Sequence, residues 1–117
     1  MKLIPSSRKV DMFTRILRAA LKPGQGDAYA RTVTQKVVPM LQRFQGFRDE
    51  MTMISADGNE AVGISFWDRE EDAEAYARTG YADVRKALEP FMTVPPEVRK
   101  YKLATSTVHA AAGTVHF

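Results

Sequence analysis

The sequence predicts an α+β fold in which strands and helices follow one another in the order β-α-β-β-α-β. Turn-forming residues divide the chain at 22–26, 45–46, 56–59, 79–80 and 94–96. Four of the resulting segments are rich in β-branched or alternating apolar residues, and the other two repeat apolar residues at spacings of three and four. This order is the ferredoxin-like arrangement, an antiparallel four-stranded sheet with its helices on one face.

The first half of the chain predicts a strand, a helix and a second strand. Residues 12–21 alternate in polarity and form the first strand. A helix follows, with Asp27 as its N-cap and with a kink or break at Pro39, because proline removes a backbone donor. Gly46 ends this helix, and residues 47–55 form the second strand. The apolar face of the helix carries Tyr29, Val33, Val37, Met40, Leu41 and Phe44.

The third strand, residues 60–67, is apolar on both faces, so both faces must be covered. The helices cover one face, and an identical subunit is the simplest cover for the other. We therefore expect a homodimer in which two sheets pack face to face. One face carries Val62, Ile64 and Phe66, and the other carries Ala61, Gly63, Ser65 and Trp67.

The remainder of the chain predicts a broken helix and a fourth strand. Asp68 and Glu71 have the spacing of a capping box, which starts the helix. Gly80 interrupts the helix, and the two prolines at 95–96 end the helical region. Residues 97–108 form the last strand.

Length and composition fit one domain over residues 1–117, with a core at about 11–108 and an N-terminal arm and a C-terminal tail outside it. The net charge is +3 with scattered basic residues, which argues against nucleic-acid binding. No apolar run approaches the roughly 18 residues of a membrane span. No apolar signal region follows the basic N-terminus, which favours a cytoplasmic location. The sequence has no cysteine, which excludes disulfides and thiolate metal sites.

Several short stretches over about residues 11–108 form a recognisable combination. They are Leu21-Lys22-Pro23-Gly24, Val38-Pro39-Met40-Leu41, Phe44-Gln45-Gly46-Phe47, Ser65-Phe66-Trp67-Asp68, Glu71-Asp72-Ala73-Glu74-Ala75-Tyr76, and Tyr81 and Arg85 with Leu88-Glu89-Pro90. With these stretches the chain resembles the antibiotic biosynthesis monooxygenases, which are dimeric α+β barrel proteins.

The resemblance implies a cofactor-independent monooxygenase that acts on a planar phenolic or polyketide-like aromatic compound. The wider superfamily also contains haem-degrading enzymes, whose pattern has an asparagine in the first strand and an iron-binding histidine in the second helix. Alignment on residues 22–24 puts Leu17 and Arg85 at these positions, and arginine has no lone pair for iron. We therefore expect no haem, flavin or metal.

The candidate substrate-binding residues surround Trp67, the only tryptophan of the chain. The small residues Gly63 and Ser65 beside it predict a cavity in which an aromatic ring stacks on the indole, with Leu17 and Tyr76 as further contacts. The alternative is that Trp67 is a core residue and that the small residues allow close helix packing.

Arg85 and Tyr81 are the candidate catalytic residues. Arg85 lies at the border of an apolar helix stripe, where a fixed cation can stabilise a phenolate or an enolate. Tyr81, or Tyr76, can orient a substrate hydroxyl. The alternative for Arg85 is a surface ion pair with Asp83 or Glu89, and for the tyrosines a hydrogen bond to a backbone carbonyl.

Two arginines of the first strand, Arg15 and Arg18, lie on opposite faces, so one of them points into a partly buried region where a charge needs a partner. The alternative is that this strand is an edge and that its arginines prevent aggregation. His109 is a candidate general base, with a solvated side chain as the alternative. Met51 and Met53 share one strand face, which is typical of core or barrel filling.

The alternative function is a non-catalytic, dimeric domain that binds a small molecule in the same cavity. A third possibility is an isomerase acting on a lactone or a related small acid. That activity requires a carboxylate or a histidine in the cavity, and no such residue can be assigned to it from the sequence.

Overall fold

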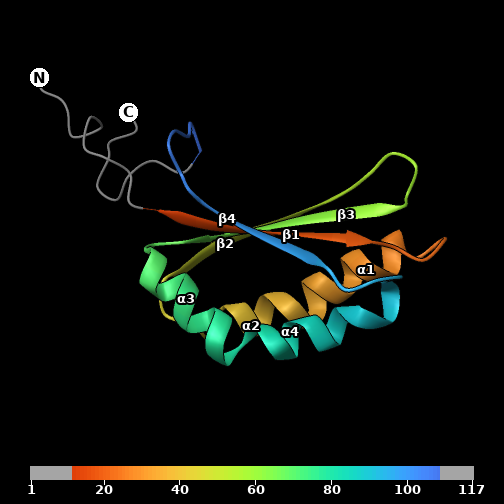
Figure 1. The fold of residues 1–117 in the computed structure, drawn as a ribbon, viewed down its shortest axis with the longest axis horizontal. Coiled ribbons are helices and arrows are strands. Elements are labelled where there is room, and N and C mark those ends of the chain that lie inside the picture. The colour runs from red at the N-terminus through yellow and green to blue at the C-terminus, as the bar shows by residue number, and fades with distance from the viewer. Residues whose placement is uncertain (1–11, 109–117) are drawn as a thin grey trace, which may run out of the picture.

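A computed structural model of the chain describes residues 12–108. Four strands form one antiparallel sheet in the order β2-β3-β1-β4, and the helices all lie against one of its faces (Figure 1). The strands are β1 (Phe13–Ala20), β2 (Phe47–Ile54), β3 (Glu60–Trp67) and β4 (Glu97–Lys102). The predicted α+β, ferredoxin-like fold is confirmed.

Strand β1 lies inside the sheet, between β3 and β4, and pairs with both of them along most of its length. The interpretation of this strand as an exposed edge is therefore wrong. Strand β4 is shorter than the predicted 97–108, because it pairs with β1 only as far as Lys102.

The first helical region is continuous but irregular. It consists of α1 (Gly26–Thr32), the π-helical turn η2 (Val33–Val37) and α2 (Val38–Leu41). Pro39 lies near the start of α2 and has no N–H to donate to the preceding turn, which is the wide π-helical turn η2. The predicted irregularity thus takes the form of a π turn. Asp27 is not the N-cap, which is Gln25, but it lies in the first turn of α1, where a negative charge suits the helix dipole.

The second helical region comprises α3 (Glu70–Thr79), α4 (Tyr81–Leu88) and the short 3-10 turn η3 (Glu89–Phe91). The predicted capping box of Asp68 and Glu71 is also wrong, because the N-cap is Arg69 and no side chain caps α3. The break at Gly80 is as predicted. A β-carbon at this position would collide with the ring of Phe44, so glycine is required for the close approach of the two helical regions.

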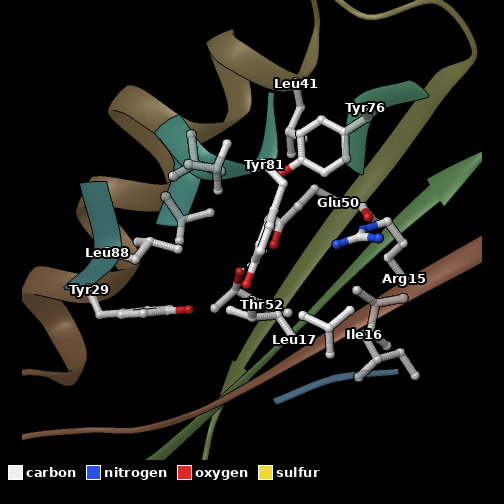
Figure 2. Close-up of a pocket in the computed structure, with 17 residues that line it drawn as sticks. Arg15, Ile16, Leu17, Tyr29, Leu41, Glu50, Thr52, Tyr76, Tyr81 and Leu88 are labelled. Carbon is white, nitrogen blue, oxygen red and sulfur yellow. Dashed lines mark hydrogen bonds between the residues drawn. The ribbon is translucent and has the colours of Figure 1, made fainter. Parts of the chain in front are cut away.

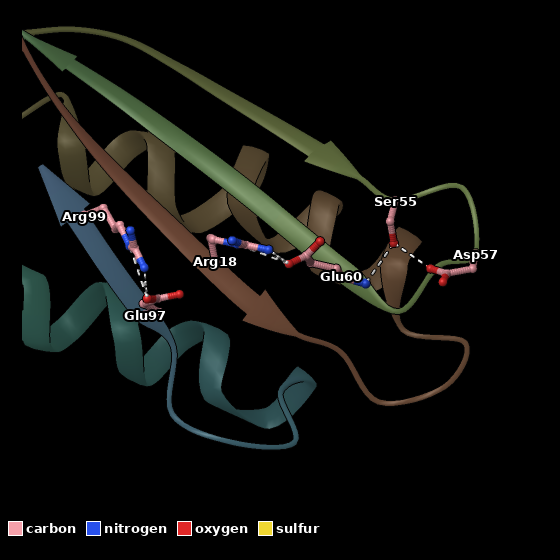
Figure 3. Close-up of polar contacts among 6 residues, drawn as sticks. All are labelled: Arg18, Ser55, Asp57, Glu60, Glu97 and Arg99. Carbon is pink, nitrogen blue, oxygen red and sulfur yellow. Dashed lines mark hydrogen bonds and ion pairs between the residues drawn. The ribbon is translucent and has the colours of Figure 1, made fainter. Parts of the chain in front are cut away.

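The helix-covered face of the sheet holds the core, which includes Trp67, Ala61 and Tyr29. The opposite face, called here the open face, carries exposed apolar side chains from β2 and β4. On this face an ion pair joins Arg18 of β1 to Glu60 of β3, and another joins Arg99 to Glu97 within β4 (Figure 3). The exposed large side chains on this face are those of Met51, Met53 and Tyr101, with 42, 50 and 48% of their surface accessible. No helix within residues 12–108 has both the length and the apolar character to cross a membrane.

Candidate functional site

A cavity lies between the sheet and the helices, and its free space amounts to about 50 Å³. This is room for a few waters, because one water needs about 10–15 Å³. Apolar side chains from the helices form most of the wall, and a small number of polar groups point inward (Figure 2). The apolar helix residues are Val33, Val37, Leu41, Val84 and Leu88.

The floor of the cavity is built by two rows of residues that run across the sheet. In one row Glu50 of β2 and Arg15 of β1 flank Ser65 of β3. In the next row Thr52 and Leu17 flank Gly63 in the same way. Because adjacent strands lie about 4.8 Å apart, the backbones of Glu50 and Arg15 are separated by about 10 Å. Small residues in the middle of each row leave the space above them open.

Arg15 brings a buried positive charge to the cavity. Its side chain is only 9% exposed, and within residues 12–108 no carboxylate lies at ion-pairing distance from it. The guanidinium carbon lies 5.5 Å from the ring centroid of Tyr76 and 5.1 Å from that of Tyr81. The aromatic faces offset part of the cost of burying the cation, but an anion would offset more of it.

Three tyrosines present phenol groups to the cavity. Tyr29 and Tyr76 are almost completely buried and Tyr81 is half-buried. Burial raises the pKa of each of the three hydroxyls, so all three stay protonated at neutral pH. Within the described part of the chain, none of these hydroxyls hydrogen-bonds to a protein group. Hydroxyls that face a cavity and have no protein partner indicate a place for water or a polar ligand.

Glu50 supplies a carboxyl group to the same cavity (Figure 2). Its Oε2 atom accepts a hydrogen bond from the Thr52 hydroxyl. The carboxyl lies above Gly63, since a β-carbon on Gly63 would be 3.5 Å from Oε2. Burial raises the pKa of Glu50, and the bond from Thr52 offsets this only in part.

The structure brings most of the predicted substrate-binding residues together. Leu17, Gly63, Ser65 and Tyr76 all line the cavity, and so does Tyr81, one of the two candidate catalytic residues.

The indole of Trp67 is not among the cavity-lining groups. It is completely buried, stacks on Tyr76 with ring centroids 5.0 Å apart and meets the edge of Phe47. Its Nε1 atom donates to the hydroxyl of Ser65 at 2.9 Å. The structure thus places Trp67 where the alternative interpretation put it, in the core behind the cavity.

Arg85 also lies outside the cavity. Its Nε atom is 2.9 Å from Oε2 of Glu89, an ion pair without the alignment of a hydrogen bond. Both side chains are more than 40% exposed, so the pair contributes little to stability. His109 lies outside the described residues.

Sequence reasoning did not place Glu50, Thr52 and Tyr29 in the site, and it left open which arginine of β1 points inward. Arg15 is the buried one, and Arg18 lies on the open face with Glu60. The alternation of side chains along β1 indicated that one of its two arginines, Arg15 or Arg18, points towards the helices. The signal for Glu50 was obscured by a β-bulge between Phe47 and Asp49, which reverses the side-chain alternation of β2.

The polar groups of the cavity suit an organic ligand better than a metal ion. Within residues 12–108 no three histidine, cysteine, aspartate or glutamate side chains gather as metal ligands. The site instead combines one cation, one carboxyl group, the Thr52 hydroxyl and three phenols. Such a set can hold an aromatic compound with an anionic oxygen at one end and a hydrogen-bond donor at the other.

Neither a protein-family model nor a curated protein matches this chain. Solved structures do resemble it. One is a monooxygenase from the gene ActVA-Orf6 of Streptomyces coelicolor in complex with nanaomycin D, with a TM-score of 0.69, 20% identity, and coverage of 80% of this chain and 88% of that one.

Two further structures have the same fold. SnoaB, a cofactor-independent oxygenase from Streptomyces nogalater, has a TM-score of 0.64 and 20% identity, with 83% of this chain and 97% of that one covered. The NE2512 protein of unknown function from Nitrosomonas europaea has a TM-score of 0.66 and 18% identity, with coverage of 81% and 91%. The chain therefore shares its fold with these proteins and with others described as putative antibiotic biosynthesis monooxygenases.

Proposed function

We propose that the chain is a cofactor-independent monooxygenase that oxidises a phenolic or polyketide-like aromatic compound in the cavity above Gly63 and Ser65. The observation that carries this proposal is the charge of the buried residue Arg15, which has no carboxylate partner in the described residues and lies over the rings of Tyr76 and Tyr81, whose hydroxyls have no protein partner there. Two proteins of the same fold are described as a monooxygenase and as a cofactor-independent oxygenase, which supports the reaction type.

Without a cofactor, this chemistry requires an electron-rich substrate, which itself supplies the electrons to O2. Deprotonation of a phenol or an enolisable ketone gives an anion that can transfer electrons to O2. For a substrate with a CH2 group beside aromatic rings, O2 converts the carbon to a carbonyl, and the two hydrogens leave with the other oxygen atom as water. A fixed cation lowers the barrier to forming the anion.

In this proposal Arg15 holds the substrate anion. Tyr81 retains its expected role of orienting a substrate oxygen, with Tyr76 beside it. Arg15 takes the role expected of Arg85, because Arg15 lines the cavity while Arg85 pairs with Glu89 outside it.

The size of the cavity limits how the substrate enters. A free space of about 50 Å³ is smaller than a planar ring system, so side chains at the wall must move on binding. Tyr81 and Leu17 are only partly buried, which makes them the first candidates for that movement.

We also propose that the chain works as a homodimer joined through the open face. Met51, Met53 and Tyr101 form a group of large exposed apolar side chains there, with Val62 and Ile64 partly buried between them. Exposed apolar groups of this kind mark an interaction surface. The helices cannot cover them, because they lie on the other face (Figure 1).

The test is oxygen consumption with 1,8-dihydroxyanthrone, a planar phenol with an oxidisable CH2 group, in buffer containing a metal chelator and no added cofactor. We expect one O2 consumed per quinone formed, at a rate well above the spontaneous one. Tyr81→Phe should lower this rate at least tenfold, because it removes the orienting hydroxyl. Tyr101→Phe is the matched control on the open face and should have the wild-type rate.

Saturable binding of the anthrone without any increase in its oxidation rate would favour the alternative, a non-catalytic small-molecule-binding domain. The absence of both binding and oxidation across a panel of quinols, flavonoids and anthrones would contradict the proposed site.

A further inference from the structure

The carboxyl group of Glu50 has no part in the proposal above, although it faces the same cavity. We propose that Glu50 is the proton acceptor of this site and that the chain catalyses proton exchange at an acidic C–H next to a carbonyl group, without O2. The inference rests on the proposed substrate cavity; it names the residue that accepts the substrate proton and an activity that needs no O2.

The first argument is the position of the two charged groups. Glu50 and Arg15 stand at the two ends of one row across the sheet, with only Ser65 between them. They do not form an ion pair with each other, since no ion pair of the described residues includes either one. A small ketone can therefore lie between them, with its oxygen towards the guanidinium and its C–H towards the carboxyl group.

The second argument is the way the carboxyl group is held. The Thr52 hydroxyl donates to Oε2, which fixes the orientation of the group and leaves Oε1 for a ligand. Gly63 has no side chain to fill the space beneath the carboxyl group. The raised pKa of Glu50 adds to this geometry, because a carboxylate with a raised pKa is a stronger base.

The reaction is balanced without an oxidant. The C–H proton moves to Oε1 of Glu50, the C–H electrons form a carbon–carbon double bond, and the carbonyl electrons move onto the oxygen. The resulting enolate is held by Arg15. Return of a proton, or of a deuteron from solvent, to the same carbon completes the exchange. Nothing is oxidised or reduced.

The test uses 2-indanone, a planar bicyclic ketone with acidic CH2 groups, in deuterated buffer under argon. Loss of the methylene signal is followed by proton NMR. We expect the wild-type chain to accelerate exchange above the buffer rate, and Glu50→Gln to lower the protein-dependent rate at least tenfold. The matched control Glu71→Gln alters an exposed glutamate of α3 and should leave the rate unchanged.

Two measurements separate the role of Glu50 from a general structural effect. Glu50→Gln should still bind 2-indanone with an affinity within a few-fold of wild type, because glutamine keeps the shape of the carboxyl group. Glu50→Asp keeps the carboxyl group but withdraws it by one methylene, so its rate should lie between those of the wild type and Glu50→Gln.

The outcomes distinguish this inference from the proposed function. Exchange that depends on Glu50 under argon, with no oxygenation in air, supports proton transfer and contradicts the monooxygenase. Oxygenation in air with an unchanged rate in Glu50→Gln overturns the role of Glu50 and leaves the monooxygenase intact. An exchange rate equal to that of buffer alone overturns the inference.

Discussion

The guanidinium carbon of Arg15 lies 5.1 Å from the centroid of the Tyr81 ring and 5.5 Å from that of Tyr76, so a cation of β1 is enclosed by aromatic side chains of α3 and α4. In an unbroken helix, residues 76 and 81 would point about 140° apart. The break at Gly80 instead brings the two rings within 6.3 Å of each other. The helix break thus helps to form the wall of the candidate site.

The charge of Arg15 should govern the binding of anionic ligands. We expect Arg15→Met to weaken binding of 4-nitro-1-naphthol, which is ionised at pH 8, by at least tenfold, or about 1.4 kcal/mol. Binding of the neutral 1-naphthol should change much less, because methionine replaces the apolar stem of the arginine. Both affinities can be measured by isothermal titration calorimetry.

The control for this experiment is Arg85→Met, which removes a cation outside the cavity and should leave both affinities unchanged. If Arg85→Met weakened the binding of the anionic ligand more than Arg15→Met did, Arg85 and not Arg15 would be the cation that holds the substrate anion.

The open face of the sheet should mediate dimerisation. Met53→Glu places a charge among exposed apolar side chains and should shift the chain from dimer to monomer in sedimentation velocity at micromolar concentration. Stable interfaces of this kind bury well over about 1,000 Å² in total. Val94→Glu, at an exposed apolar residue outside the sheet, is the matched control and should remain dimeric. A wild-type chain that sediments as a monomer would refute the dimer.

The stability of the fold should depend on the protonation of Glu50. Burial raises the pKa of this carboxyl in the folded state above its ordinary value of 4.5, so the folded state binds more protons than the unfolded state between the two pKa values. The contribution of Glu50 to stability is therefore complete below the ordinary pKa and is lost as the pH rises through the raised one. Glutamine does not ionise, so Glu50→Gln should remove this loss of stability at higher pH.

Urea unfolding at several pH values from 4 to 8 measures this effect as the difference between the wild type and Glu50→Gln. Glu71→Gln serves as the exposed control and should follow the wild type. Parallel pH profiles for the wild type and Glu50→Gln would show that the carboxyl group is not buried as described.

Two glycines should respond differently to an added methyl group. Gly80→Ala forces a β-carbon into the ring of Phe44 and should destabilise the fold by about 1–3 kcal/mol, the usual cost of overpacking. Gly63→Ala meets only ordinary contacts, the nearest at 3.5 Å, so it should fold normally while reducing the cavity. Urea denaturation compares the two variants, and an equal loss of stability would contradict the close packing of Gly80 on Phe44.

The sequence by itself determined the order of the elements, because hydrophobic periodicity and turn residues are local signals. The strands, the break at Gly80 and the two apolar faces of β3 could all be predicted from these signals. The same alternation put Gly63 and Ser65 on the helix-covered face, and there they form the cavity floor.

Only the tertiary structure decided which charged side chains reach the cavity. The bulge after Phe47 turns Glu50 and Thr52 towards the helices and leaves Met51 and Met53 on the open face, and no residue type in β2 marks such a bulge. The choice between Arg15 and Arg85 depended on strand pairing and helix packing, because both lie in partly apolar segments of the sequence. Pairing across the sheet carried Arg15 beneath Tyr76 and Tyr81, whereas the helical spacing of four residues gave Arg85 a local partner in Glu89.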